Sequence, residues 1–121
     1  MGKARFAIGH LVIPVGDMPL ALHFYRDVLG FVVVGDEDPV WTVVNAGGAE
    51  LTLFLRPDSP RIALGKNGED SPFALHVADF SAAARASRED GCRVKKLDEH
   101  QGILWDPSGN VFALHDHRED D

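Results

Sequence analysis

The chain contains two copies of one pattern, and this repeat constrains its fold more than any other feature. One copy, HLVIPVGDMPLALHFYRDVLGF, occupies residues 10–31, and the other, PFALHVADFSAAARASREDGC, occupies residues 72–92. Each copy has an alternating apolar strand, a turn that ends in Asp, a helical segment and then Gly. Val15-Gly16-Asp17 matches Val77-Ala78-Asp79, and the offset stays nearly constant along the copies. The repeat therefore predicts two copies of one structural unit, with function in the cleft between them.

Turn and cap residues divide each copy into one strand, one helix and three further strands. In the first module, about 5–56, we expect strands near 5–15, 31–35, 40–46 and 49–56, and a helix from the N-cap Asp17 to about Leu29. A Pro- and Gly-containing linker covers about 57–71. In the second module, about 72–117, we expect a helix near 80–90 and strands near 72–78, 92–97, 101–106 and 110–116. The sequence thus predicts a single α+β domain, residues 1–121, of two tandem βαβββ modules.

Composition limits the possible partners and the cellular location. The 121 residues carry a formal net charge of −7, which argues against nucleic acid as a partner because no basic excess is present. The only cysteine is Cys92, which fits a reducing compartment. No apolar stretch approaches the roughly 20 residues that a membrane helix needs, and the N-terminal segment has the pattern of a strand rather than a signal peptide. We therefore expect a cytoplasmic protein with no membrane partner.

Strand alternation predicts which side chains face the cleft. In the segment ELTLFLR, residues 50–56, every odd position is Leu and should pack under the helix. Applied to the first and last strands of each module, the same rule collects polar groups on the face away from the helices: His10, Glu50, Thr52, Arg56, His76 and His115. Polar residues set among apolar neighbours are typical of a small-molecule cleft.

Three motifs carry a resemblance that covers nearly the whole chain: FYRDVLGF at 24–31, ELTLF at 50–54 and DPSGNVFAL at 106–114. With them, the chain resembles the vicinal oxygen chelate superfamily, which includes glyoxalase I, extradiol dioxygenases, fosfomycin-resistance enzymes and bleomycin-binding proteins. The resemblance implies that the two modules form a U-shaped, eight-stranded mixed sheet around a cleft, with the helices on the outer face. It also implies a homodimer.

The resemblance further implies a metal ligand on the first and last strand of each module. The first module matches at both positions, with His10 and Glu50, whereas the second has Pro72 and Ala113, which cannot bind a metal. Imidazole and carboxylate together suit one divalent Zn, Fe, Mn or Ni ion. Two protein ligands are fewer than the three of a usual catalytic site, so two alternatives stay open. Either His76 or His115 completes a metal site, or His10 and Glu50 act without a metal.

The remaining candidates each have a functional and a structural interpretation. His76 could act as a general acid or base with Glu50, and His115 could contact a ligand, or both histidines could form a polar wall. Thr52 and Phe54 would line the cleft, and Arg56 could hold an anionic group or lie in solvent. Trp41 and Trp105, in corresponding strands of the two modules, could stack on a planar ligand or pack in the core or a dimer interface.

Two functions of different classes therefore remain open. The first is metal-dependent lyase, isomerase or dioxygenase chemistry on a small organic substrate, with His10 and Glu50 as metal ligands. The second is metal-free binding and sequestration of a small molecule such as an antibiotic. The missing ligands of the second module favour binding, and the retained pair of the first module favours the enzyme.

Overall fold

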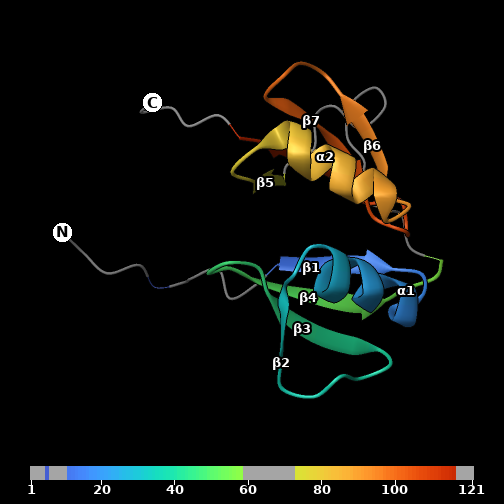
Figure 1. Cartoon of the computed structure of the whole chain (residues 1–121). Helices are drawn as coiled ribbons and strands as arrows, with labels where there is room; N and C mark the ends of the chain where they lie inside the picture. Colours follow the sequence, from blue (N-terminus) through green and yellow to red (C-terminus); the bar gives the residue numbers. More distant parts are fainter. Residues whose placement is uncertain (1–4, 6–10, 59–72, 117–121) are drawn as a thin grey trace.

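The computed structural model of the chain describes residue 5 and residues 11–58 and 73–116 (Figure 1). The first module consists of β1 (Leu11–Val15), α1 (Met18–Leu22), η1 (His23–Val28), β2 (Val32–Val34), β3 (Trp41–Asn45) and β4 (Glu50–Leu55). The second consists of β5 (Ala74–His76), α2 (Phe80–Glu89), β6 (Arg93–Lys96), β7 (Gln101–Trp105) and β8 (Val111–His115). No helix in these ranges is long and apolar enough to cross a membrane.

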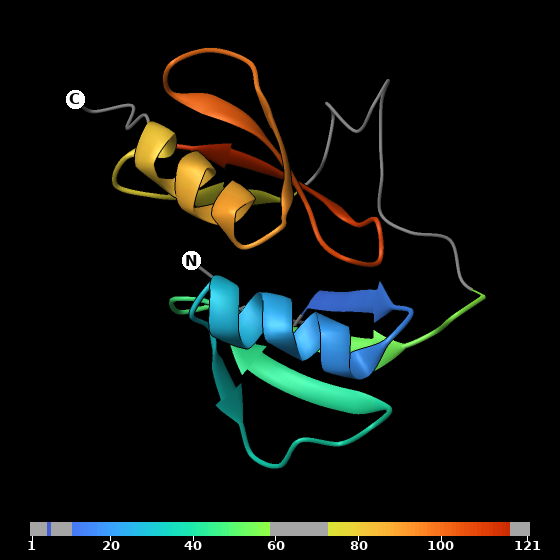
Figure 2. The same ribbon diagram turned by 45° about the vertical axis from the view of Figure 1, so that its right-hand side comes forward.

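The two modules repeat one sheet topology. The strand orders are β1-β4-β3-β2 and β5-β8-β7-β6, and in each sheet the first strand runs parallel to the last while the other pairs are antiparallel. In each module the helical segment covers one face of the sheet, and the opposite face is turned away from it (Figures 1 and 2). The predicted α+β class and the two βαβββ modules are confirmed. Within the described ranges, hydrogen bonds join the strands into two four-stranded sheets.

Both helices begin at the aspartates that the repeat singles out. An Oδ1 atom of Asp17 accepts the Leu20 N–H at 3.0 Å, and the equivalent atom of Asp79 accepts the Ala82 N–H at 3.1 Å. These bonds satisfy N–H groups that the first turn of a helix leaves without partners. After each helix the chain reverses at a glycine in the left-handed region, Gly30 with φ +81° and Gly91 with φ +85°.

The first helix differs from the regular helix that the sequence predicts. After α1 it widens into η1, a π-helical segment, and the Leu29 N–H bonds to the Phe24 carbonyl at 2.9 Å. Two adjacent aromatic residues, Phe24 and Tyr25, are both buried in this segment. Since π-helical turns are rare and often found at functional sites, the wide turn is a feature to explain. Here it accompanies a buried contact with the second module.

Side-chain alternation divides each sheet as predicted. On the helix side, Ile13, Val15 and Leu53 of the first module are fully buried, as are Phe112 and Leu114 of the second. They belong to one apolar core shared by the two modules. Burying such side chains contributes about 1.5–3 kcal/mol each before the entropy of ordering the chain is set against it. This shared core fixes the opposite faces of the sheets in place.

A buried hydrogen-bond network joins the modules at the turn before β8, and we call it the inter-module network. The Tyr25 hydroxyl donates to Oδ2 of Asp106 at 2.6 Å, and the Asn110 side-chain amide donates to the same oxygen at 2.8 Å and to the Pro14 carbonyl at 2.7 Å. The Ser108 hydroxyl accepts the Gly16 N–H at 2.8 Å. The motifs FYRDVLGF and DPSGN therefore meet in space and hold the two modules together.

Tyr25 makes the inter-module network measurable, because it is the only tyrosine of the chain. Burial, and then the negative charge of Asp106 and its hydrogen bond, raise the pKa of Tyr25 well above its ordinary value. The stabilisation linked to this proton is complete below about pH 10 and is lost as the pH rises above it, because the unfolded chain ionises first. We expect tyrosinate absorbance to appear only together with alkaline unfolding. Ionisation near pH 10 in the folded protein would contradict this environment.

Gly102 on β7 is required by its close contacts. A Cβ atom at this position would lie 2.6 Å from Cζ of the buried Phe80 ring and would overlap the backbone carbonyl of Lys95, which β-sheet pairing holds in place. We expect Gly102→Ala to lower the free energy of unfolding by about 1–3 kcal/mol, as overpacking does elsewhere. Urea denaturation of the variant and the wild type measures this difference. An unchanged midpoint would show that helix α2 can move away from the sheet.

Candidate functional site

The face of the first sheet away from the helices holds an aromatic cluster. Trp41 on β3 lies opposite Phe54 on β4, and their ring centroids are 5.0 Å apart at an interplanar angle of 68°. The Arg56 guanidinium lies over the Phe54 ring, with its Cζ atom 4.4 Å from the ring centroid. Alternation along β4 places these groups on one face. The three residues Trp41, Phe54 and Arg56 form what we call the aromatic cluster.

Exposure differs sharply among the predicted residues of this face. The Trp41 side chain is 42% exposed and Glu50 is also exposed, whereas Thr52 is 0% exposed and forms the floor of the face. The apolar surface continues onto β2, where Val32 is 66% exposed and Val34 points the same way. This face therefore combines exposed aromatic and aliphatic surface with one cation and one carboxylate.

On the second sheet, the predicted histidines are neighbours. His76 and His115 pair in register on β5 and β8, and their ring centroids are 5.2 Å apart at 82°. His76 is exposed and His115 is half-buried. Each ring can therefore be reached from solvent, and an imidazole in this position can donate or accept a proton.

Trp105 has a different environment from Trp41. It is 9% exposed and packs with Ile103 and Val111 in a small second core, and the Arg93 guanidinium covers its ring at 4.0 Å. The two tryptophans occupy corresponding strands but opposite ends of them, because Trp41 begins β3 whereas Trp105 ends β7. Only Trp41 presents a broadly accessible ring.

The described residues bring together few side chains that could bind a metal. His10 and Pro72 lie outside them, and within them no three His, Cys, Asp or Glu side chains gather in a group that could hold a metal ion. The pairing of β1 with β4 and of β5 with β8 shows which positions of the two modules correspond. Ala113 of the second module corresponds to Thr52 of the first, and Val111 therefore corresponds to Glu50. Neither Val111 nor Ala113 has a donor atom. The described residues therefore do not fit a three-ligand metal site.

Asp116 is a polar residue whose role the sequence did not indicate. One carboxylate oxygen accepts the Phe80 N–H at 2.7 Å, and the other lies 2.9 Å from Nδ1 of His100. These hydrogen bonds, with that from Phe80 contributing most, hold the pKa of Asp116 below its ordinary value. Asp116 thus adds a second cap to α2 and ties it to the end of β8.

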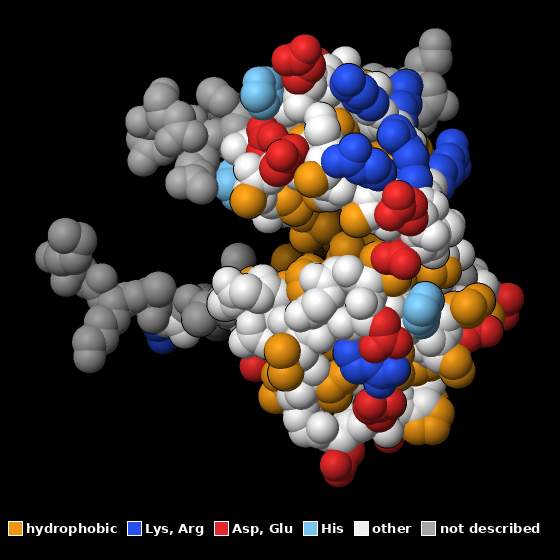
Figure 3. Space-filling model, in the orientation of Figure 1, with side chains coloured by type: hydrophobic (Ala, Val, Ile, Leu, Met, Phe, Trp, Pro, Cys, Tyr) orange, Lys and Arg blue, Asp and Glu red, His pale blue; other side chains and the backbone are white. Residues whose placement is uncertain are grey.

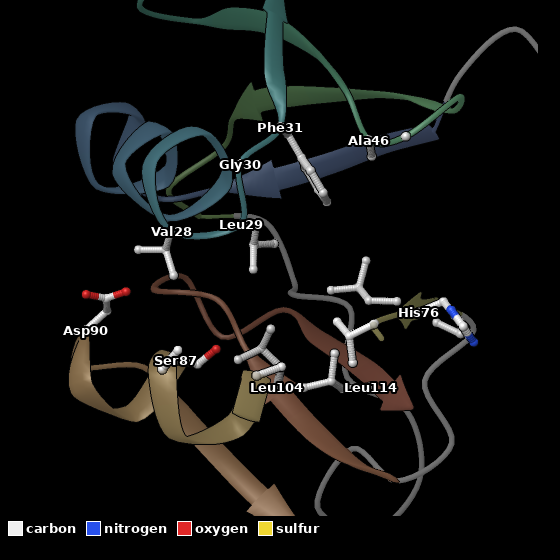
Figure 4. Close-up of a pocket in the computed structure, with 16 residues that line it drawn as sticks. Val28, Leu29, Gly30, Phe31, Ala46, His76, Ser87, Asp90, Leu104 and Leu114 are labelled. Atoms are coloured by element: carbon white, nitrogen blue, oxygen red, sulfur yellow. The ribbon is translucent and has the colours of Figure 1, made fainter. Parts of the chain in front are cut away.

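A hollow of about 660 Å³ lies between the modules (Figures 3 and 4). Apolar side chains from both modules dominate its wall: Val28, Leu29, Phe31, Ala46, Leu75, Val77, Ala83, Ala86, Leu104 and Leu114. We call it the inter-module hollow. Of the predicted site residues that the structure describes, only His76 borders it, and the His76 ring points away from it (Figure 4). The repeat predicted a cleft between the modules, but the sequence did not indicate these wall residues, because they have the composition of an ordinary core.

A comparison with curated proteins gives one significant relative. The chain is 29% identical over 110 residues to a catechol-2,3-dioxygenase of Bacillus subtilis (strain 168), and this alignment covers 90% of the chain. The chain spans only 37% of the length of that relative.

Solved structures show the same architecture. TnmS3, an antibiotic binding protein from Streptomyces sp. CB03234, is 28% identical with a TM-score of 0.67, and the match covers 94% of this chain and 100% of that one. A lactoylglutathione lyase from Agrobacterium tumefaciens shares the fold, with a TM-score of 0.64 at 21% identity over 94% of this chain and 96% of that one. A sequence profile matches residues 7–114, nearly the whole repeat, and it shows that the chain belongs to the Glyoxalase/Bleomycin resistance protein/Dioxygenase superfamily.

Proposed function

We propose that this protein binds a small planar aromatic compound on the aromatic cluster of the first module and does so without a metal. The observation that carries the proposal is the accessible Trp41 ring, 42% exposed, next to Phe54 and Arg56. An exposed ring of this kind can stack on a planar ligand, and such contacts are worth about 0.5–1.5 kcal/mol beyond the buried area.

Charge supports a ligand that carries an anionic group. The Arg56 guanidinium lies at the end of the aromatic cluster, where its planar donors suit a carboxylate or a phenolate. Glu50 lies on the same face at the start of β4, and a hydrogen-bond donor of the ligand could reach it. The likeness to an antibiotic binding protein at 28% identity agrees with binding as the function.

The second module also favours binding without a metal. The residues of the second module that correspond to Glu50 and Thr52 of the first are Val111, which is buried, and Ala113, and neither side chain has an atom that could bind a metal. His76 and His115 lie together on the same sheet. We propose that they form a polar wall of the binding site, with His76 able to exchange a proton with a bound ligand.

The second candidate is metal-dependent lyase, isomerase or dioxygenase chemistry. The observation that favours it is Glu50, whose exposed carboxylate has no hydrogen-bond or ion-pair partner among the described residues. Glu50 directly precedes Leu51, and Leu51 pairs with Leu11, the residue that follows His10 in the sequence. A divalent ion held there would act as a Lewis acid. The likeness to a catechol-2,3-dioxygenase supports this candidate.

Tryptophan fluorescence tests the binding proposal, with naphthoate as the planar anionic probe. We expect saturable quenching in the wild type, no quenching in Trp41→Phe, and quenching as in the wild type in Trp105→Phe, because Arg93 covers Trp105. Calorimetry on the same three proteins gives the affinities independently of the fluorophore. Quenching that persists in Trp41→Phe and disappears in Trp105→Phe would place the ligand on the second module and reject the proposed site.

A further inference from the structure

The inter-module hollow lies where two helices end, whereas the aromatic cluster lies on the face of the first sheet away from its helix. Val28 and Leu29, at the end of η1, line one side, and Ser87 and Asp90, at the end of α2, line the other (Figure 4). The turn at Gly30 sends the chain into β2 and lets Phe31 point into the hollow (Figure 4). Its volume of about 660 Å³ is within the usual range of ligand sites.

The electrostatic character of the hollow follows from these two helix ends. Turn N–H groups bond the Tyr25, Arg88 and Ser87 carbonyls at these ends, and the C-terminus of a helix carries a partial negative charge, roughly half of an elementary charge. Two such ends converge here, so their partial charges add. A cation is therefore favoured beside Val28 and Asp90, and an anion is disfavoured.

Asp90 adds a full negative charge at the same place. Apart from His76, whose ring points away, it is the only titratable side chain among the described residues that borders the hollow. Its carboxylate has no hydrogen bond or ion pair among residues 11–58 and 73–116. The nearest arginine in the sequence, Arg88, donates to the Val94 carbonyl at 3.4 Å, and Arg93 covers the Trp105 ring at 4.0 Å. The carboxylate is thus available to a ligand.

We propose that the inter-module hollow binds a small organic cation, an amine or quaternary ammonium with a compact apolar body. The apolar body occupies the space between Phe31, Leu104 and Leu114, and the cationic group lies beside Asp90 and the two helix ends. This site is separate from the aromatic cluster and does not depend on the function proposed for that cluster. The net charge of −7 adds a general attraction for cations.

Calorimetry with three compounds of one shape tests both parts of the proposal. Adamantanemethylamine, adamantanemethanol and adamantanecarboxylate share a compact apolar cage that cannot stack on Trp41. We expect the amine to bind about fivefold more tightly than the alcohol at low salt, with the carboxylate weakest. The preference for the amine should shrink as the salt concentration rises.

Matched variants on α2 locate the site. Ala86→Trp fills the hollow and should abolish binding of all three compounds, whereas Ala82→Trp, equally exposed on the same helix but outside the wall, should leave binding unchanged. Asp90→Asn should reduce the amine to the affinity of the alcohol, and Glu89→Gln should not. Circular dichroism checks that each variant is folded.

Three results would overturn the proposal. If none of the compounds binds, or if Ala86→Trp binds them as the wild type does, the hollow is not a ligand site. If the alcohol and the amine bind equally in the wild type, the hollow takes neutral apolar molecules, and the assignment to a cation is wrong.

Discussion

Asp106→Ala is expected to lower the free energy of unfolding by about 3–5 kcal/mol, which is a large share of the stability of a domain of this size. Asp106 accepts hydrogen bonds from the Tyr25 hydroxyl at 2.6 Å and, at 2.8 Å each, from the Ser108 N–H, the Asn110 N–H and the Asn110 amide. Removal of the carboxylate leaves several buried donors without an acceptor, and each such donor costs about 1–3 kcal/mol. Urea denaturation monitored by circular dichroism measures the loss.

An exposed aspartate on another turn provides the control for this variant. Asp98 accepts bonds from the His100 N–H and the Gln101 amide, both at 2.8 Å, but lies in solvent. We expect Asp98→Ala to cost less than about 1 kcal/mol, because water replaces the lost acceptor. If the two variants lose equal stability, burial of the inter-module network is not what makes Asp106 important.

Phe54→Ala is expected to weaken binding of naphthoate at least about tenfold, the largest effect that we foresee at the aromatic cluster. The Phe54 ring lies against both the Trp41 ring and the Arg56 guanidinium, so its removal takes away the group that both would-be ligand contacts pack on. Val34→Ala removes apolar surface from the same face, away from the aromatic cluster, and should change affinity by less than about threefold. Equal losses in both variants would indicate general apolar binding instead of stacking.

The architecture could be predicted because repetition, caps and turns all pointed to the same fold. Asp17 and Asp79 begin the helices, Gly30 and Gly91 follow them, and alternation along β4 assigns the leucines to the core. Signals of this kind depend only on residues close together in the sequence, so a single sequence is enough to interpret them. The sequence did not predict the π-helical η1. Its Tyr25 bonds to Asp106, which lies far along the chain, and local signals do not describe such a contact.

The candidate site could be predicted only in part, for a physical reason. Alternation tells which face a side chain is on, but not what covers that face. Trp41 and Trp105 therefore looked equivalent, although Arg93 covers only Trp105. Thr52 was expected to line the cleft, but its side chain is fully buried. The inter-module hollow arises from the packing of the modules, which no periodicity describes.

Titration of the metal-stripped protein with naphthoate, followed by Trp41 fluorescence, tests the central claim most directly. It is repeated after addition of Zn, Mn, Fe or Ni, and with the variants His10→Ala and Glu50→Gln. Our account predicts saturable quenching without metal, with an affinity that neither the metals nor the two variants change more than about threefold. Binding that appears only after a metal is added, and that both variants abolish, would contradict metal-free binding and establish His10 and Glu50 as ligands of a metal-dependent site.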